Sequence, residues 1–407
     1  MNNMLSIEQA TRTLRKLLKR VEGTESIPIE EALSRVPQGS ISAPIDLPPF
    51  RSSAMDGYAL CGPPEIEPGS RFRVCGESRA GHPYLFPLGM GQACRVFTGS
   101  AIPENTTAVV IQEEVKHDKS SIVVLQEVNT NDNIREQGTD IRKDQPLTLV
   151  YEALSPYTLS WLAACGIKKV EVVRKIKVAV FCTGDELRDP GESLGEGDIY
   201  DSNRMSLKLL LRRKPVELID LGKLADDYDQ IKTKIKSVLD EVDLVITSGG
   251  VSVGDADLVR PVIEDIGTLE FWNIAVKPGK PFAVGRLNDT MFFGLPGNPV
   301  STIITFLMFV EPSIDILSGL PWQTPARFRA KLVEHISHRA GRAEFQRGYV
   351  VNDIQGLKVQ PTGDQSSHRL GSFSRCNCLI VIPAHRDNLH PGEIVELYLL
   401  PGCRNLV

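Results

Sequence analysis

The chain has 407 residues, 42% of them hydrophobic and 24% charged, and a formal net charge of −5 at pH 7. This length exceeds what one hydrophobic core usually organises, so we expect roughly two to four domains in an ordinary globular protein. The mildly acidic balance excludes a general attraction to nucleic acid or to anionic membranes. An anionic ligand must therefore be held by local groups, such as backbone amides, a few basic side chains or a metal.

The N-terminal segment shows no apolar core long enough for a signal peptide. Its apolar residues from Leu5 to Leu18 follow helical spacing and predict a helix over residues 5–20. The longest apolar stretch, at residues 303–310, is too short to span a membrane. The eight cysteines form no zinc-binding pattern, and reduced thiols without a signal peptide indicate a cytoplasmic protein.

The segment up to residue 166 predicts a small β-rich domain between helical elements. Residues 26–36 are expected to form a short strand or turn that leads into a helix. Residues 51–147 are rich in β-branched residues, glycine and proline, in the short alternating runs that are typical of a β-domain with many turns. Residues 153–166 predict a helix that ends at Gly166.

From residue 178 onward, strand and helix patterns alternate. Apolar runs predict strands at residues 178–182, 216–221, 243–247 and 291–293. Helices are expected near residues 203–213, 228–239, 256–266 and 300–317. Asp201 or Ser202 is expected to cap the first of these helices. The alternation predicts a doubly wound parallel sheet, and residues 328–400 predict a second small β-domain.

Polar loops follow the predicted strands, and in a parallel sheet such loops share one edge where ligands bind. The glycine-rich loop after residue 247 is the most informative. Gly249, Gly250 and Gly254 let the backbone approach an anion, and the following helix N-terminus favours phosphate. Asp255 and Asp257 could hold a hard cation such as Mg²⁺. An ordinary glycine turn with a capping aspartate fits the same residues equally well.

Other motifs are less specific. The turn at residues 277–281, which contains Lys277, Lys280 and two prolines, favours an oxyanion clamp over a solvated lysine pair. Residues 53–58, 98–103 and 138–142 would by their composition alone be tight turns. The histidines show no zinc-hydrolase spacing, and no G-x-S-x-G motif supports a serine esterase.

Taken together, the motifs resemble those of one family. Their order and spacing over nearly the whole chain are similar to the MoeA family of molybdopterin molybdenumtransferases, which is similar to the catalytic end of gephyrin. The matching stretches are SAMDGYAL, TGSAIPENTTAVVIQEE, GTDIR, TGDEL, YDSN, SGGVSVGDAD, FWNIAVKPGKPFAVG and LPGNPVS.

The resemblance implies a multidomain fold of α/β and β parts. A doubly wound, molybdopterin-binding α/β domain would span residues 178–326, and a β-rich domain residues 47–147. A discontinuous linker domain would combine residues 1–46 with residues 148–177. A C-terminal β-barrel domain would span residues 327–407.

The resemblance also implies the function. The chain would be a molybdopterin molybdotransferase that inserts molybdenum from molybdate into adenylylated molybdopterin, with Mg²⁺ dependence and release of AMP. The enzyme would be a homodimer with its site between the α/β domain of one chain and the β-rich domain of the other. Expected partners are other molybdenum cofactor biosynthesis proteins and apo-molybdoenzymes, with no nucleic acid and no membrane.

Individual positions match the functional residues of the family. The catalytic positions are Asp56, Thr98, Asp140, Glu186, Asp226 and Asp257. Mg²⁺ would be held by Glu186, Asp226 and Asp257. Positions for the rest of the substrate are Gly249, Gly250, Ser252, Gly254, Pro296 and Pro299. The positions that match the molybdate cradle are Lys277, Lys280, Ser301, Arg347 and Ser367.

Some residues and alternatives stay open at this stage. Asn273 stands where many relatives carry lysine, which removes one positive group near the oxyanion. An adenylyltransferase of molybdopterin would share the glycine-rich loop but would not need the β-rich and C-terminal domains. A non-catalytic scaffold of the gephyrin type is a further alternative, although no long linker is appended. Molybdate and tungstate share shape and charge, so the sequence does not separate them.

Overall fold

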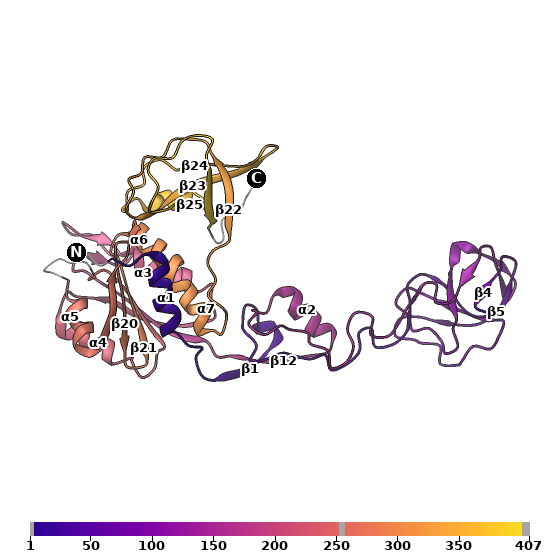
Figure 1. Ribbon diagram of the computed structural model, residues 1–407. Coiled ribbons are helices and arrows are strands. Elements are labelled where there is room, and N and C mark those ends of the chain that lie inside the picture. Colours follow the sequence, from indigo (N-terminus) through magenta and orange to yellow (C-terminus); the bar gives the residue numbers. More distant parts are fainter. Residues whose placement is uncertain (1–3, 252–256, 401–407) are drawn as a thin grey trace. The chain divides into compact units, whose positions relative to one another are not determined.

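The computed structural model describes residues 4–251 and 257–400, which fold into two compact units (Figure 1). One unit comprises Met1–Glu25, Ser34–Val36 and Val172–Val407, and the other comprises Ser26–Leu33 and Pro37–Glu171. The division falls within strands β1 (Thr24–Pro28) and β12 (Lys169–Val173). The finer division into four domains, with the boundaries given above, stays a prediction.

A six-stranded sheet forms the centre of the α/β part of the first unit. Its strand order is β16 (Val216–Leu224), β13 (Ile176–Thr183), β17 (Leu244–Ser248), β21 (Thr290–Leu295), β20 (Pro281–Leu287) and β18 (Thr268–Asn273). The first four strands pair in parallel. Two short strands, β14 (Leu187–Arg188) and β15 (Ile199–Tyr200), pair separately.

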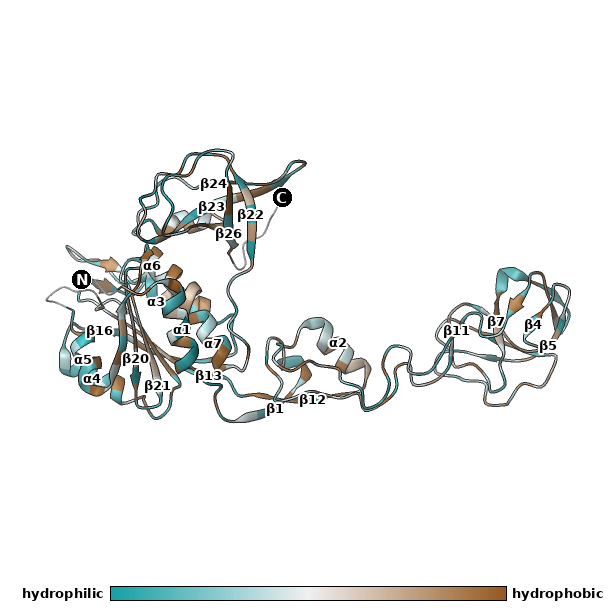
Figure 2. Cartoon of the chain, viewed as in Figure 1, coloured by the Kyte–Doolittle hydropathy of each residue, from teal (hydrophilic) through white to brown (hydrophobic). Residues whose placement is uncertain are grey.

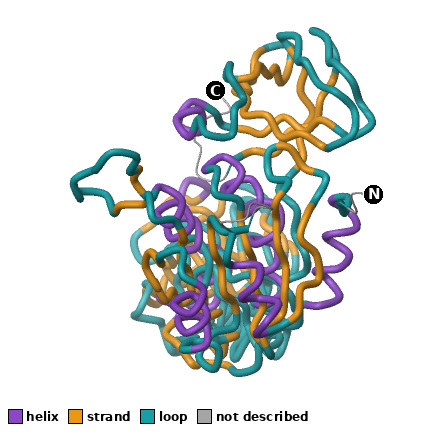
Figure 3. The backbone as a smooth tube through the Cα atoms, turned by 90° about the vertical axis from the view of Figure 1, so that its left-hand side faces the viewer, coloured by secondary structure: helices purple, strands orange, loops and turns teal. Residues whose placement is uncertain are grey.

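Apolar residues on both faces of β13 bury it between two helical layers. Val178 and Val180 face one core, which also contains residues of α1 (Ile7–Leu17), α3 (Ser202–Leu211) and α6 (Pro299–Thr305). Ala179 and Phe181 face a second core with α4 (Tyr228–Lys236) and α5 (Val259–Ile266). Figure 3 shows helices against the strands, and in Figure 2 these helices carry both hydrophilic and hydrophobic residues. The sheet is therefore doubly wound, as predicted.

One edge of the sheet is antiparallel, which the strand and helix patterns did not predict. Strand β20 runs antiparallel to both β21 and β18, and neither β20 nor β18 was predicted. Leu287 pairs with Thr290, so a two-residue turn joins β20 to β21, and Asn288 takes a φ of 55° within it. Such tight turns favour asparagine in the left-handed region and impose antiparallel pairing.

Side-chain caps fix two helix starts at the rim of the sheet. The Asp201 side chain accepts a hydrogen bond from the Arg204 backbone at the start of α3, which confirms the predicted cap. Asp227 accepts from the Gln230 backbone in the same way at α4. Each cap marks the point at which a polar loop at the sheet edge ends and a helix begins.

A long apolar helix follows the last parallel strand. It runs from α6 through a π-helical turn, η3 (Phe306–Val310), into α7 (Glu311–Leu317). Among the described helices, this segment alone has the length and composition to cross a membrane, but most of it is buried inside the protein. Its burial in the first core explains the apolar composition without a membrane.

The C-terminal part is a closed five-stranded barrel. Its strands are β22 (Arg327–Leu332), β23 (Ala343–Asp353), β24 (Gly356–Pro361), β25 (Cys378–Ile382) and β26 (Ile394–Leu399). Pairing of β23 with β25 closes the ring. The short strand β19 (Val276–Lys277) leaves the α/β part and pairs in parallel with β23, and η4 (Leu370–Arg375) lies between β24 and β25.

The second unit contains a six-stranded sheet and a short helical segment. The sheet order is β7 (Ala108–Ile111), β3 (Gly57–Cys61), β6 (Gln92–Val96), β5 (Arg71–Ser78), β9 (Ser121–Val124) and β8 (Val115–Asp118). Two-stranded pairs are β2 (Ser52–Ser53) with β11 (Ile134–Arg135) and β4 (Glu65–Ile66) with β10 (Val128–Asn129). The turn η2 (Gln112–Glu114) follows β7. The predicted β-rich segment is thus confirmed.

The helical segment of this unit differs in part from the prediction. Helix α2 (Pro156–Ala164) begins at a Ser155 cap, and Gly166 follows it with a φ of 80°, as expected. The helix expected within residues 26–36 does not form. That stretch makes only one 3₁₀ turn, η1 (Ile29–Glu31), because Ser34 turns into the left-handed region with a φ of 62°.

Candidate functional site

A cleft of about 580 Å³ lies at the carboxyl edge of the parallel strands. The loops after β13, β16, β17 and β21 all contribute to it, together with the first turn of α3. Convergence of these loops is the property expected for a ligand site in an open α/β sheet. The barrel adds His368 and Leu370 to the same lining.

The loop after β17 needs glycine at two positions. Gly249 has a φ of 92°, and a Cβ there would lie 2.7 Å from the Thr183 carbonyl oxygen. Gly250 has a φ of 65°, and its Cβ would lie 2.5 Å from the Val259 side chain. The backbone therefore turns against both β13 and α5, in a conformation that other residues rarely adopt. Ser252 and Gly254 of the predicted loop, like Asp255, lie outside the described residues.

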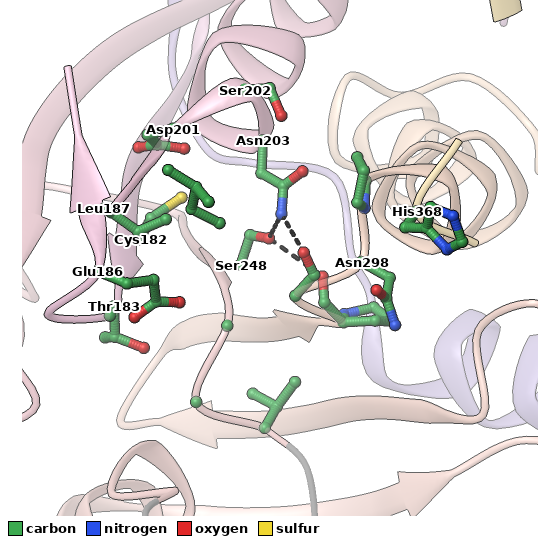
Figure 4. A pocket seen from close by; sticks show the side chains of 18 of the residues that line it. Cys182, Thr183, Glu186, Leu187, Asp201, Ser202, Asn203, Ser248, Asn298 and His368 are labelled. Carbon is green, nitrogen blue, oxygen red and sulfur yellow. Dashed lines mark hydrogen bonds between the residues drawn. The ribbon is translucent and has the colours of Figure 1, made fainter. Parts of the chain in front are cut away.

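A hydrogen-bonded clamp joins this loop region to the last loop of the cleft (Figure 4). The Asn203 amide donates to the Ser248 hydroxyl at 2.9 Å and to the Gly297 carbonyl at 2.6 Å. The Ser248 and Thr302 hydroxyls reach the Pro296 carbonyl at 3.1 and 2.6 Å. The predicted residues Pro296 and Pro299 lie in this loop and line the cleft. The clamp fixes the loop because these hydrogen bonds join five polar groups, two of which are backbone carbonyls of the last loop.

Three predicted carboxylates line the cleft. They are Glu186, Asp226 and Asp257. Burial raises the pKa of Asp226, and the negative charges of Asp185, Glu186 and Asp257 raise it further. Asp257 precedes α5, whose N-cap residue is Leu258 without a side-chain cap. The carboxylates thus repel one another, which is the electrostatic setting in which a cation binds.

The donor set fits Mg²⁺ with few protein ligands. Among the described residues, no three His, Cys, Asp or Glu side chains are grouped to hold a metal ion. Neither lysine nor arginine occurs among the described residues of the lining. Mg²⁺ commonly uses one or two carboxylates, waters and substrate phosphates, so a preformed cage is not required. A phosphorylated ligand in this acidic cleft would need such a cation to offset repulsion.

Asp201 also lines the cleft, but its carboxylate is engaged elsewhere. It is buried, caps α3 and pairs with the Arg204 side chain at 3.0 Å. Arg204 in turn donates to Asp220 at 2.9 Å. Asp201 therefore supports the start of α3 and the position of the neighbouring Asn203.

Two of the stretches that carry residues predicted for the molybdate cradle contact α6. A Cβ on Gly279 would lie 2.8 Å from the Thr305 side chain, so the turn that bears Lys277 and Lys280 packs on this helix. The Val300 amide donates to the Ser367 carbonyl at 3.1 Å, which places Ser367 beside the buried Ser301. Two distant stretches of sequence thus reach the same helix.

Arg347 is placed differently from the other members of the cradle. Its side chain is fully buried, and its guanidinium donates to the Ser372 hydroxyl at 2.9 Å. It also donates to the carbonyls of Gln365 at 3.1 Å and Ser366 at 3.2 Å. Burial lowers the pKa of Arg347. In this structure the guanidinium holds the loop that carries Ser367 and does not line the cleft.

The predicted residues of the β-rich region form two separate contacts. The backbone and hydroxyl of Thr98 donate to one Asp56 carboxylate oxygen at 2.7 and 2.8 Å. Both hydrogen bonds lower the pKa of Asp56, the backbone bond most. Asp140 instead accepts a hydrogen bond from the Trp161 indole of α2 at 3.0 Å. Asp56 is therefore oriented as an exposed carboxylate in its turn.

Several residues of the site had no assigned role from the sequence. Asn203 belongs to the YDSN motif. The feature of the sequence that could have identified it is its position as a polar residue in the first turn of a helix at the sheet edge. Glu344 and Gln346 are buried side chains in the stretch before Arg347. Charged residues such as Glu344 are rarely buried without partners. His368 follows the predicted Ser367 and faces the cleft.

Family models match most of the chain. The MoeA N-terminal region (domains I and II) matches residues 5–166. A model described as "Probable molybdopterin binding domain" matches residues 179–315, and the MoeA C-terminal region (domain IV) matches residues 329–400.

Individual relatives match over nearly the whole of this chain. The chain is 40% identical to a molybdopterin molybdenumtransferase of Haemophilus influenzae over 97% of this chain and 98% of the relative. It is 28% identical to gephyrin of Dictyostelium discoideum over 99% of this chain and 63% of that protein. A crystal structure of a MoeA molybdopterin biosynthesis protein from Pyrococcus horikoshii has 31% identity and a TM-score of 0.82, covering 98% of this chain and 100% of its own. The chain therefore belongs to the MoeA family of molybdopterin molybdenumtransferases.

Proposed function

We propose that the chain is a transferase of molybdenum cofactor biosynthesis that inserts molybdenum into adenylylated molybdopterin. Molybdate supplies the metal as a substrate, and water cleaves the phosphoanhydride of the substrate so that AMP is released in a Mg²⁺-dependent reaction. The acidic cleft beside the 277–281 turn is the observation that supports this reaction. One part of the site offers carboxylates for a cation, and the other offers lysines and hydroxyls for an oxyanion.

Residues of the cleft would bind the nucleotide part of the substrate. The turn at Gly249 and Gly250 allows close approach of the backbone to phosphate. Glu186, Asp226 and Asp257 would hold Mg²⁺, one or two of them directly and the rest through water. When bound, this ion polarises the phosphoanhydride and offsets charge on the leaving phosphate. The Asn203 clamp keeps the surrounding loops in place during the reaction.

Residues along α6 would bind molybdate. Lys277 and Lys280 offset the charge of the dianion, while the hydroxyls of Ser301 and Ser367 orient its oxygen atoms. The two thiols of the substrate attack molybdenum, two Mo–S bonds form, and the two thiol protons leave with one displaced oxo ligand as water. No protein nucleophile is required, which agrees with a site made of cations, hydroxyls and carboxylates.

We further propose a cytoplasmic homodimer whose site is completed by Asp56, Thr98 and Asp140 of the partner chain. The support is that the two motif sets lie in separate compact units, and each set is incomplete alone. Mixing inactive Asp56→Ala chains with inactive Asp257→Ala chains should restore activity through hybrid dimers. A lack of recovery after verified subunit exchange would argue against a shared site.

Mass spectrometry of the bound product tests the proposed function. The purified chain is incubated with adenylylated molybdopterin, Mg²⁺ and either molybdate or tungstate. We expect a metal-containing, deadenylylated dithiolene and an equivalent amount of AMP. ATP consumption with formation of adenylylated molybdopterin would instead identify an adenylyltransferase, and binding without conversion would support a scaffold.

A further inference from the structure

A buried carboxylate contacts one lysine of the proposed molybdate cradle. Lys277 ends β19, and the parallel pairing with β23 sets it opposite Glu344 of the barrel. Its ammonium lies 3.1 Å from Glu344 Oε1 and 3.2 Å from Oε2. The Glu344 side chain is only 3% exposed, whereas that of Lys277 is 48% exposed. The lysine therefore reaches from the protein surface to an anion inside the barrel.

Two further side chains hold the Glu344 carboxylate. His338 Nδ1 lies 2.6 Å from Oε2, and the Gln346 amide donates to Oε1 at 3.1 Å. The backbone of His338 is itself held by the Asn388 side chain at 3.0 Å. Each carboxylate oxygen thus has a partner besides Lys277, so the carboxylate is fixed from the barrel side. A buried charge with this many partners is rigid.

The ammonium of Lys277 has three N–H donors, and its contact with Glu344 is to a buried carboxylate, whereas about half of the lysine side chain is exposed. Because the Lys277 side chain is partly exposed, N–H donors of its ammonium that do not contact Glu344 are accessible to a ligand. We propose that Glu344 is a positioning residue that holds the Lys277 ammonium in place for molybdate. This inference rests on the proposed function, because it takes Lys277 as a molybdate-binding residue.

A carboxylate so close to the oxyanion has two opposite effects. Its negative charge repels a dianion and by itself weakens molybdate binding. Its hydrogen bonds to Lys277 reduce the motion of a flexible side chain and by themselves strengthen binding. The positioning role requires the second effect to be the larger. Positioning and repulsion therefore predict changes of opposite sign in molybdate affinity when the charge of Glu344 is removed.

Two substitutions separate these effects in calorimetric titrations of the full-length protein with sodium molybdate. Glu344→Gln removes the charge, and Glu344→Asp keeps the charge but withdraws the carboxylate by one methylene. Positioning predicts that both variants bind molybdate roughly ten-fold more weakly, the size expected for a lost charged hydrogen bond. Repulsion alone predicts tighter binding by Glu344→Gln and little change in Glu344→Asp, which would overturn the proposal.

Matched variants isolate the contact with Lys277. Asp353→Asn removes a carboxylate of the same barrel that pairs with Lys358, and it should leave molybdate affinity unchanged. The double variant Lys277→Ala/Glu344→Gln should bind as weakly as Lys277→Ala alone, because the carboxylate acts through this lysine. Additive losses would assign Glu344 a separate structural role and overturn the inference.

Two further readouts distinguish the possible failures. If Lys277→Ala keeps full molybdate affinity, the proposed cradle itself fails. If Lys277→Ala weakens binding but neither Glu344 variant does, only the positioning role fails. Melting transitions are recorded for every variant, and Glu344→Asp decides the outcome if Glu344→Gln does not fold, because it keeps the buried charge and both barrel partners.

Discussion

Asp257→Asn is expected to lower the rate of AMP release by about 100-fold or more. The substitution keeps the size of the side chain and removes one carboxylate from the acidic lining of the cleft. Loss of a metal ligand commonly costs on the order of 3 kcal/mol of transition-state stabilisation. Folding should persist because Asp257 precedes α5 and is not its N-cap residue. The measurement is single-turnover AMP release at several Mg²⁺ concentrations.

Asp227→Asn is the matched control for this prediction. Asp227 is the next residue after Asp226, lies at the same rim and caps α4 without lining the cleft. Asparagine caps helices nearly as well as aspartate, so this variant loses only charge. It should keep AMP release within about two-fold, the effect expected of surface electrostatics. Calorimetry with Mg²⁺ alone adds a binding readout, and equal Mg²⁺ affinity in Asp257→Asn and the parent would remove Asp257 from the proposed ligands.

The alternation of strands and helices in the α/β part was predictable from local patterns. Continuous apolar runs predicted β13 and β17, because strands buried on both faces require them. The cap at Asp201 was also predictable from the local sequence, because it depends on one side chain and its own helix. Strand β20 was not predictable, because its direction depends on a turn at Asn288 and on pairing with β21.

The candidate site residues were chosen from the order of the motifs, but the geometry of these residues could not be predicted from it. The sequence marks Arg347 as a candidate without stating where its guanidinium donates, and the structure directs it to loop carbonyls. Glu344 lies three residues before Arg347, and its contact with Lys277 depends on the pairing of β19 with β23. Contacts between segments far apart in sequence are decided by tertiary packing, so local patterns could not have predicted them.

Arg347→Lys is expected to weaken molybdate binding by roughly 1–3 kcal/mol, the range for lost hydrogen bonds to a charged group. A lysine keeps the charge, but its single nitrogen cannot span the Ser372 hydroxyl and the carbonyls of Gln365 and Ser366. The loop that carries Ser367 would lose its support, and buried carbonyls would lose their donors. We therefore expect a lower Tm together with the weaker molybdate binding. Affinity for the pterin nucleotide should change little, because its phosphates are assigned to Gly249 and Gly250.

The control is Arg369→Lys in the same loop. Arg369 is exposed and pairs with Asp364 at 2.9 Å, so its replacement should cost less than about 1 kcal/mol. Titrations with molybdate and with the pterin nucleotide, combined with Tm, then separate three cases for Arg347. Weaker molybdate binding with a lower Tm supports loop positioning, whereas weaker binding with an unchanged Tm means that the guanidinium contacts the oxyanion directly. A lower Tm with unchanged molybdate affinity would make Arg347 an anchor of the barrel alone, and molybdate would then depend on Lys277, Lys280 and the hydroxyls beside α6.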